Sequence, residues 1–301
     1  MDALLEFALY FVAIAGIYGM LALSLNLQAG VTGLLNFGQV AFFGIGAYAT
    51  GIAALLGAHW IVGFLVGQAL AVLFGLLLGR IGRTLSADYW AIVTLAGAET
   101  LRLVVNNQTD LTGGPQGIGG IAGPFDLLPE GSQGVAWLVL CLGLLTVSYV
   151  IAERLTGMQF GRVLRLIREQ PHVAQSLGYD VTRKKMVVLA VSGAMAAAGG
   201  CLYTLYISFI GPGQLLPMET FLVFTMLILG GMGNNKGAVL GALVVQLLYT
   251  TARFLKDVLP IPDESASSIR ILIVGLVLVV FLLWRPDGLL AERPRRIHAP
   301  N

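Results

Sequence analysis

The amino-acid sequence predicts an all-α polytopic membrane protein with about 8–10 transmembrane helices, some of them broken or re-entrant. Composition is the first observation behind this fold class. Apolar residues make up 57% of the chain and charged residues 11%, whereas an ordinary soluble domain has roughly 25% charged residues. The second observation is a series of long apolar runs, which differ from the short alternating segments of a β-barrel. The third is a single long charged interval, residues 153–185, between two of these runs.

Most of the apolar runs approach the length of about 20 residues that a helix needs to cross a bilayer. Regular spans are expected at residues 4–27, 60–79, 89–105, 135–152, 186–210, 238–254 and 268–284. Two intervals are irregular, because 28–56 is interrupted by glycines and 218–230 is short. Broken helices are tolerated in a membrane only where protein buries them or a cavity adjoins them. We expect all of these segments to form one transmembrane domain, residues 1–301.

The distribution of charge predicts the orientation. Basic residues concentrate at Arg80 and Arg83, in the loop 153–185 and in the tail 285–301, and the positive-inside rule assigns all three to the cytoplasm. The segment 106–134 has acidic residues and no Lys or Arg, so it is expected outside. The N-terminus, MDALLEF, lacks the basic region of a signal peptide. It lies outside if 28–56 crosses the membrane and inside if that interval only re-enters.

The loop 153–185 is expected to contain two short amphipathic helices. In the first, arginines alternate with apolar residues at helical spacing. The second follows Pro171 and ends at Gly178, a residue type that is common at helix C-termini. Such helices either rest on lipid headgroups or dock a cytosolic partner. The residues assigned to docking are Arg162, Arg165, Arg168, Glu169, His172, Ala174 and Gly178.

Candidate pathway residues lie in the glycine-interrupted interval 28–56. There Asn36 and Gln39 are followed closely by Phe42 and Phe43, so two amides and two aromatic rings adjoin a predicted helix break. Polar side chains of this kind either bind a solute or bridge helices.

A second candidate is the pair formed by Glu99 and Arg102, which lie three residues apart within the predicted span 89–105. This spacing places them on one helix face, where they can form an ion pair. The pair either shapes a solute path from the bundle interior or neutralises itself near the outer interface. At the start of the segment 218–230, Glu219 is expected to be an exposed interface residue.

The sequence contains no catalytic motif with the spacing of a hydrolase, a metalloprotease or a phosphate-binding loop. Three scattered histidines do not suggest a metal site, and Cys141 and Cys201 are interpreted as packing residues within apolar spans. We therefore expect no enzymatic activity, metal or bound cofactor, and no affinity for nucleic acid. Energy for transport then comes from an ion gradient or from another protein chain.

Five blocks in the same order resemble the permease subunits of branched-chain amino acid ABC importers. They are LNLQAGVTGLLNFGQVAFFGIGAYATG, ADYWAIVTLAGAETLRLVVNN followed by LTGGPQGIGGI, RVLRLIREQPHVAQSLGYDVTRKKM, GGMGNNKGAVLGA and RPDGLL. The resemblance extends over nearly the whole chain. It implies a bacterial inner-membrane protein that pairs with a second, homologous permease. It also implies two cytosolic ATPase subunits that bind the ATP, and an extracytoplasmic solute-binding protein.

The same resemblance implies that the loop 153–185 couples ATP hydrolysis to transport. His172, Val173 and Ala174 match the positions of the family's coupling motif, and Gly178 follows at the expected offset. The leading Glu of that motif is absent here, and Glu169 lies one turn earlier. Replacing Arg165 and Arg168 with Glu is expected to uncouple transport.

Other functions compete with this interpretation. Urea and short-chain amide permeases share most of the five blocks. A gradient-driven carrier would need no ATPase, and a membrane scaffold would not transport at all. Nothing in the sequence identifies the solute.

Overall fold

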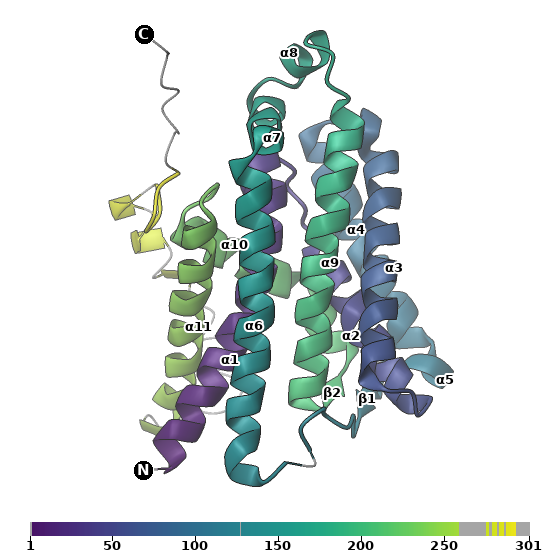
Figure 1. Ribbon diagram of the computed structural model, residues 1–301, viewed down its shortest axis with the longest axis vertical. Coiled ribbons are helices and arrows are strands. Elements are labelled where there is room, and N and C mark those ends of the chain that lie inside the picture. The colour runs from purple at the N-terminus through teal and green to yellow at the C-terminus, as the bar shows by residue number, and fades with distance from the viewer. Residues whose placement is uncertain are drawn as a thin grey trace.

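The computed structural model describes residues 2–126, 128–258, 275–276, 279–281, 283–285 and 287–292. The chain forms a bundle of long helices that run roughly parallel and antiparallel to one another (Figure 1). In chain order the helices are α1 (Asp2–Leu25), continued by a π-helical segment (Asn26–Val31), α2 (Gln39–Leu55), α3 (Trp60–Ile81), α4 (Ala87–Asn107), α5 (Thr109–Thr112), α6 (Glu130–Gly157), α7 (Gln159–Glu169), α8 (Pro171–Ser176), α9 (Val181–Ile207), α10 (Pro217–Gly230) and α11 (Asn235–Val258).

The remaining regular elements are short. Three 3-10 turns occur at Gly82–Thr84, Gly114–Gln116 and Pro212–Leu215. Two short strands, β1 (Ile118–Gly119) and β2 (Phe209–Ile210), pair antiparallel with Ile118 opposite Ile210. They join the loop before α6 to the segment after α9.

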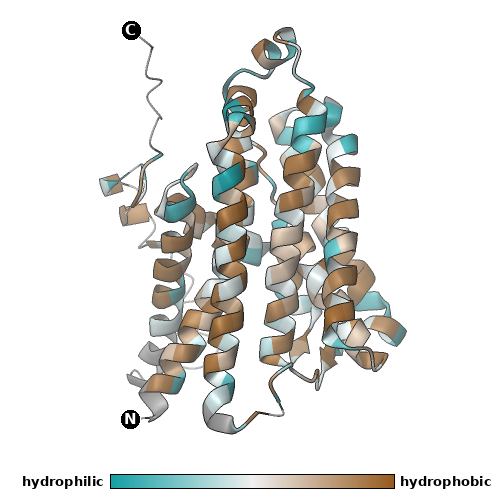
Figure 2. Ribbon diagram, in the orientation of Figure 1, coloured by the Kyte–Doolittle hydropathy of each residue, from teal (hydrophilic) through white to brown (hydrophobic). Residues whose placement is uncertain are grey.

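The protein is a multi-pass membrane protein. Among the described residues, four helical segments are long and apolar enough to cross a bilayer: Leu5–Val31, Trp60–Ile81, Ser132–Gly157 and Val181–Ile207. Figure 2 shows apolar residues along the middle of α3, α6 and α9 and hydrophilic residues toward the end that carries α7 and α8. The expected all-α membrane class is therefore confirmed. The predicted span 268–284 lies mostly outside the described residues.

The bundle has two chemically different ends. The loop of α7 and α8 lies at one end, and β1 and β2 lie toward the other (Figure 1). The last turn of α3 contains the basic residue Arg80, and the adjacent Gly79 packs against Met186 near the start of α9. The C-terminal end of α3 therefore lies at the same end of the bundle as α7 and α8. β1 belongs to the predicted external segment, 106–134, and lies toward the end of the bundle that is opposite α7 and α8. The basic end of α3 and β1 thus lie toward opposite ends of the bundle, and the side of the membrane that each end faces stays a prediction.

Two interruptions divide the transmembrane helices. The π-helical end of α1 is followed by a non-helical stretch before α2 begins at Gln39. A second interruption separates the end of α9 from α10, which begins at Pro217 and has only 14 residues. At 1.5 Å per residue this is about 21 Å, less than the ~30 Å of a hydrocarbon core. The sequence predicted a break within 28–56 and a short segment at 218–230, and the break before α2 and the length of α10 agree with these two expectations.

Glycines allow the central helices α2, α3 and α9 to pack closely. A Cβ atom on Gly46 of α2 would lie 2.1 Å from the carbonyl oxygen of Ala197 in α9, and one on Gly200 would lie 2.0 Å from that of Phe43. Small residues at such contacts bring membrane helices close enough for dense van der Waals packing. This packing fixes α2, and with it the residues at its N-terminus.

Candidate functional site

A buried polar cluster surrounds the break between α1 and α2. It consists of side chains that are completely inaccessible to solvent, each hydrogen-bonded to another member of the group: Ser24, Gln28, Asn36, Gln39 and Ser192. Nε2 of Gln28 donates to Oε1 of Gln39 at 3.0 Å and to Oγ of Ser192 at 2.7 Å. Nδ2 of Asn36 donates to Oε1 of Gln28 at 2.8 Å. Such a network in a low-dielectric interior fixes the orientation of each amide.

The non-helical stretch is fixed by further polar contacts. The backbone N–H of Gly38 donates to Oδ1 of Asn36 at 2.9 Å, and that of Phe37 donates to Oγ1 of Thr94 at 3.2 Å. These bonds satisfy amides that a broken helix would otherwise leave unpaired within the membrane. Asn36 is therefore a structural member of the break as well as a neighbour of Gln39.

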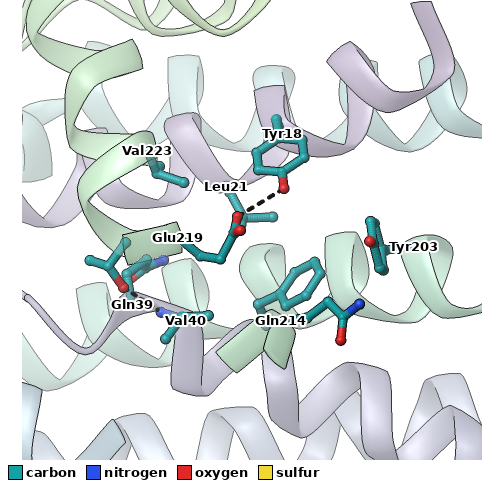
Figure 3. Close-up of a pocket in the computed structure, with 10 residues that line it drawn as sticks. Tyr18, Leu21, Gln39, Val40, Tyr203, Gln214, Glu219 and Val223 are labelled. Carbon is teal, nitrogen blue, oxygen red and sulfur yellow. Dashed lines mark hydrogen bonds between the residues drawn. The ribbon is translucent and has the colours of Figure 1, made fainter. Parts of the chain in front are cut away.

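Next to this cluster lies a narrow cavity of about 30 Å³. Its lining comes from α1, α2, α9, α10 and the turn before α10: Tyr18, Leu21, Gln39, Val40, Phe43, Tyr203, Gln214, Glu219, Thr220 and Val223. Figure 3 shows these side chains around the carboxylate of Glu219. In this conformation the cavity has room for ordered water, which needs about 10–15 Å³ per molecule, and not for an amino acid.

The carboxylate of Glu219 lies near the middle of the membrane, beside the central part of α1. The hydroxyl of Tyr18 donates to Oε2 of Glu219 at 2.9 Å (Figure 3). Tyr18 is the middle residue of the apolar segment Leu5–Val31, so the bond lies near the middle of the membrane. The expectation that Glu219 is an exposed interface residue is wrong, because its side chain is half-buried and its carboxylate lines the cavity, although the neighbouring Met218 is exposed.

The N-termini of α2 and α10 meet at this cavity. The backbone N–H of Val40, in the first turn of α2, donates to Oγ1 of Thr220, in the first turn of α10, at 3.1 Å. Helix N-termini carry a partial positive charge. In many membrane transporters, the N-termini of broken helices meet at one site within the membrane and bind charged groups of the solute there.

The predicted pathway residues fall into three groups. Gln39 and Phe43 line the cavity, and Asn36 lies behind Gln39 in the polar cluster. Phe42 faces away, into a separate apolar cluster where its ring lies 5.1 Å from that of Phe74. Sequence spacing could not distinguish Phe42 from Phe43, because adjacent residues of a helix project about 100° apart.

Glu99 and Arg102 form the ion pair that their spacing predicts. Nε of Arg102 donates to Oε2 of Glu99 at 2.9 Å, and their side chains are 22% and 36% exposed. Neither residue lines the central cavity. The geometry fits a self-neutralised pair on α4.

The predicted amphipathic helices are present as α7 and α8. Leu164 and Ile167 of α7 and Ala174 of α8 are buried, while Arg162, Glu169 and His172 are exposed. Pro171 begins α8, and Gly178 has a φ of 84°, the left-handed conformation that ends a helix. The tip beyond α8 exposes Leu177 (64%) and Tyr179 (40%).

Arg165 and Arg168 point into the protein. Arg165 pairs with Oε1 of Glu292 at 3.0 Å and Arg168 with Oε2 of Glu292 at 2.9 Å. Arg168 also donates to the carbonyl oxygen of Gly30, in the π-helical end of α1. These two arginines therefore connect α7 to the C-terminal segment and to the helix break, and in this structure they do not extend toward a partner.

Sequence reasoning missed Tyr18, Tyr203 and Gln214 as lining residues. Each lies in a stretch that reads as ordinary apolar helix or loop, and only the packing of α1, α9 and α10 brings them to one cavity. The one signal in the sequence was the acidic Glu219 at the edge of an apolar segment, since ionisable groups within spans mark functional sites. Among the described residues, no cluster of His, Cys, Asp and Glu could hold a metal ion.

Comparison with known proteins places the chain in a family. The profile described as "Branched-chain amino acid transport system / permease component" matches residues 7–282. The chain belongs to this permease family. The match includes the broken helices, the cavity and both short helices of the loop 153–185.

Individual relatives agree with this assignment. The high-affinity branched-chain amino acid transport system permease protein LivM of Salmonella typhimurium is 33% identical, over 91% of this chain and 68% of its own length. A probable LivM of Methanocaldococcus jannaschii is 31% identical, over 93% of this chain and 92% of its own. The Salmonella typhimurium high-affinity branched-chain amino acid transport system permease protein LivH is 26% identical, over 92% of this chain and 94% of its own length. No solved structure matches the chain.

Proposed function

We propose that the chain is a permease subunit of an ATP-driven importer and carries branched-chain or related hydrophobic amino acids across the bacterial inner membrane. The observation that carries this proposal is the family match over residues 7–282. The relatives reported above are named for branched-chain amino acids, which favours these solutes over urea and short-chain amides. The mid-membrane cavity gives the proposal a physical site.

The proposed pathway passes the N-termini of α2 and α10. Gln39 and Phe43 line it, Asn36 and Phe42 fix the position of α2, and Glu99 and Arg102 shape the adjoining surface of α4. The closed cavity fits one state of an alternating-access cycle, in which a solute site is never open to both sides.

The proposed partners follow from the same assignment. A second, homologous permease completes the pore, two cytosolic ATPase subunits bind and hydrolyse the ATP, and an external binding protein delivers the solute. Relatives named LivM and LivH both align with this chain, which supports a pair of related permeases. The permease itself needs no cofactor. In this arrangement α7, α8 and the C-terminus lie in the cytoplasm.

Docking of the ATPases is proposed to use the exposed tip around α8. Leu177 and Tyr179 expose apolar surface there, beside the polar His172. Arg165 and Arg168 then transmit the movement of α7 to Gly30 and Glu292 rather than bind the ATPase themselves. Charge reversal of both arginines is expected to uncouple ATP hydrolysis from transport while leaving the ATPases bound.

Co-purification tests this assignment. The chain is co-expressed with its candidate partner permease and ATPases, and complexes are captured in detergent through a tag on this chain. Leu177→Glu is expected to reduce recovered ATPase at least about tenfold, because burying an unpaired carboxylate in an interface is strongly unfavourable. The control is Leu128→Glu, an equally polar change at an exposed leucine of the predicted external segment. Recovery unchanged by Leu177→Glu contradicts the docking assignment.

A further inference from the structure

We propose that Glu219 binds the α-ammonium group of the transported amino acid, and that the apolar wall of the same cavity receives its side chain. The chemical class recognised is a zwitterionic α-amino acid with an aliphatic side chain. This inference rests on the proposed function and assigns it a specificity-determining residue. It differs from recognition by the external binding protein, because the site lies within the permease.

The charge of Glu219 has no protein counter-ion in the described part of the chain. Oε2 accepts the Tyr18 hydroxyl, and none of the ion pairs among the described residues includes Glu219. An ionisable group at this depth is unfavourable unless a partner or a bound solute compensates it. A primary ammonium group offers both the opposite charge and three hydrogen-bond donors.

The two helix N-termini are complementary to the rest of a zwitterion. Glu219 is in the first turn of α10, where the helix dipole stabilises its carboxylate form. The N-terminus of α2 adjoins the same cavity at Gln39 and Val40. Its partial positive charge favours the α-carboxylate of the solute. The lining of one cavity therefore includes a negative group and the positive end of a helix, which match the two charges of an amino-acid zwitterion.

The apolar part of the lining suits an aliphatic side chain. The apolar lining residues come from three helices and are all almost fully buried: Leu21, Val40, Phe43 and Val223. Removing a leucine-sized side chain from water into this lining favours binding. Urea and small amides have neither a cationic group for Glu219 nor a side chain for this wall.

The present conformation is the closed form of the site. At about 30 Å³ the cavity excludes an amino acid, and the Tyr18 hydroxyl occupies the carboxylate oxygen that an ammonium donor would use. The solute is admitted when the N-terminus of α10 separates from α1. α2 begins after a non-helical stretch and α10 after a 3-10 turn, Pro212–Leu215, so each helix has a break in the α-helix before its N-terminus at which this separation can occur.

Saturation-transfer NMR on the detergent-purified permease–ATPase complex without its binding protein tests the inference, because this method detects millimolar binding. The ligands are leucine and 2-hydroxy-4-methylpentanoate, in which a hydroxyl replaces the ammonium group. Wild type is expected to bind leucine at least about tenfold better than the hydroxy acid, the factor expected from a charged hydrogen bond. Glu219→Gln is expected to remove this preference. Glu6→Gln, an exposed acid on α1, is the matched control and keeps it.

The outcomes separate the two proposals. Equal binding of both ligands by wild type, or a leucine preference that survives in Glu219→Gln, overturns the role of Glu219 alone. If the wild-type complex with its binding protein imports no amino acid, the proposed function fails instead. Should Glu219→Gln not assemble, Glu219→Asp is measured, and it is expected to bind leucine more weakly while retaining the preference over the hydroxy acid.

Discussion

At the residue scale, polar side chains near a helix break were predictable and their distant partners were not. Asn36 and Gln39 stand out because amides are unusual beside a glycine-rich apolar segment. Glu219 was visible in the sequence, but its hydrogen bond to Tyr18 joins residues 201 positions apart. No local periodicity contains that information, since it depends on where α10 begins relative to α1.

Glycine packing gives a prediction at the same scale. Gly46→Ala is expected to destabilise the protein by about 1–3 kcal/mol, because the added methyl group would overlap the Ala197 carbonyl oxygen and force α2 from α9. Thermal unfolding in detergent measures the change. Gly143→Ala in α6 is the matched control, with open space at the added atom, and is expected to be neutral or slightly stabilising. Equal stability of both variants would contradict the packing account.

At the scale of elements, the sequence predicts α7 and α8 well and their connections poorly. Arginines alternating with apolar residues, followed by Pro171 and Gly178, specify two short amphipathic helices. The same letters suggested that Arg165 and Arg168 face a partner. Their actual partner, Glu292, is more than a hundred positions away and belongs to a tail whose packing the sequence does not reveal.

Removing the charge of Glu292 tests whether it fixes α7. Glu292→Gln is expected to speed amide hydrogen exchange in α7 roughly fivefold, equal to about 1 kcal/mol, since partly exposed ion pairs contribute little individually. The control is Glu169→Gln, because that carboxylate lies 3.6 Å from Arg168 and is 68% exposed. Exchange in α7 that is equally fast in wild type and Glu292→Gln would show that the ion pairs do not hold this helix.

At the scale of the whole molecule, hydropathy and charge predict the membrane class and the separation of basic and acidic ends. They do so because a bilayer imposes span lengths and charge asymmetry directly on the sequence. They do not predict which helices become neighbours. The close contact of α2, α3 and α9, and the meeting of the N-termini of α2 and α10, arise from glycine contacts and hydrogen bonds between distant segments.

The central claim is that ATP hydrolysis drives the import of amino acids through this permease. The most direct measurement is uptake of radiolabelled leucine into proteoliposomes that contain this chain, its partner permease and the ATPases, with binding protein and leucine outside and ATP inside. We expect uptake that requires both ATP and this chain and that persists when a protonophore abolishes ion gradients. Uptake without the ATPases that collapses with the protonophore would contradict the claim and identify a gradient-driven carrier.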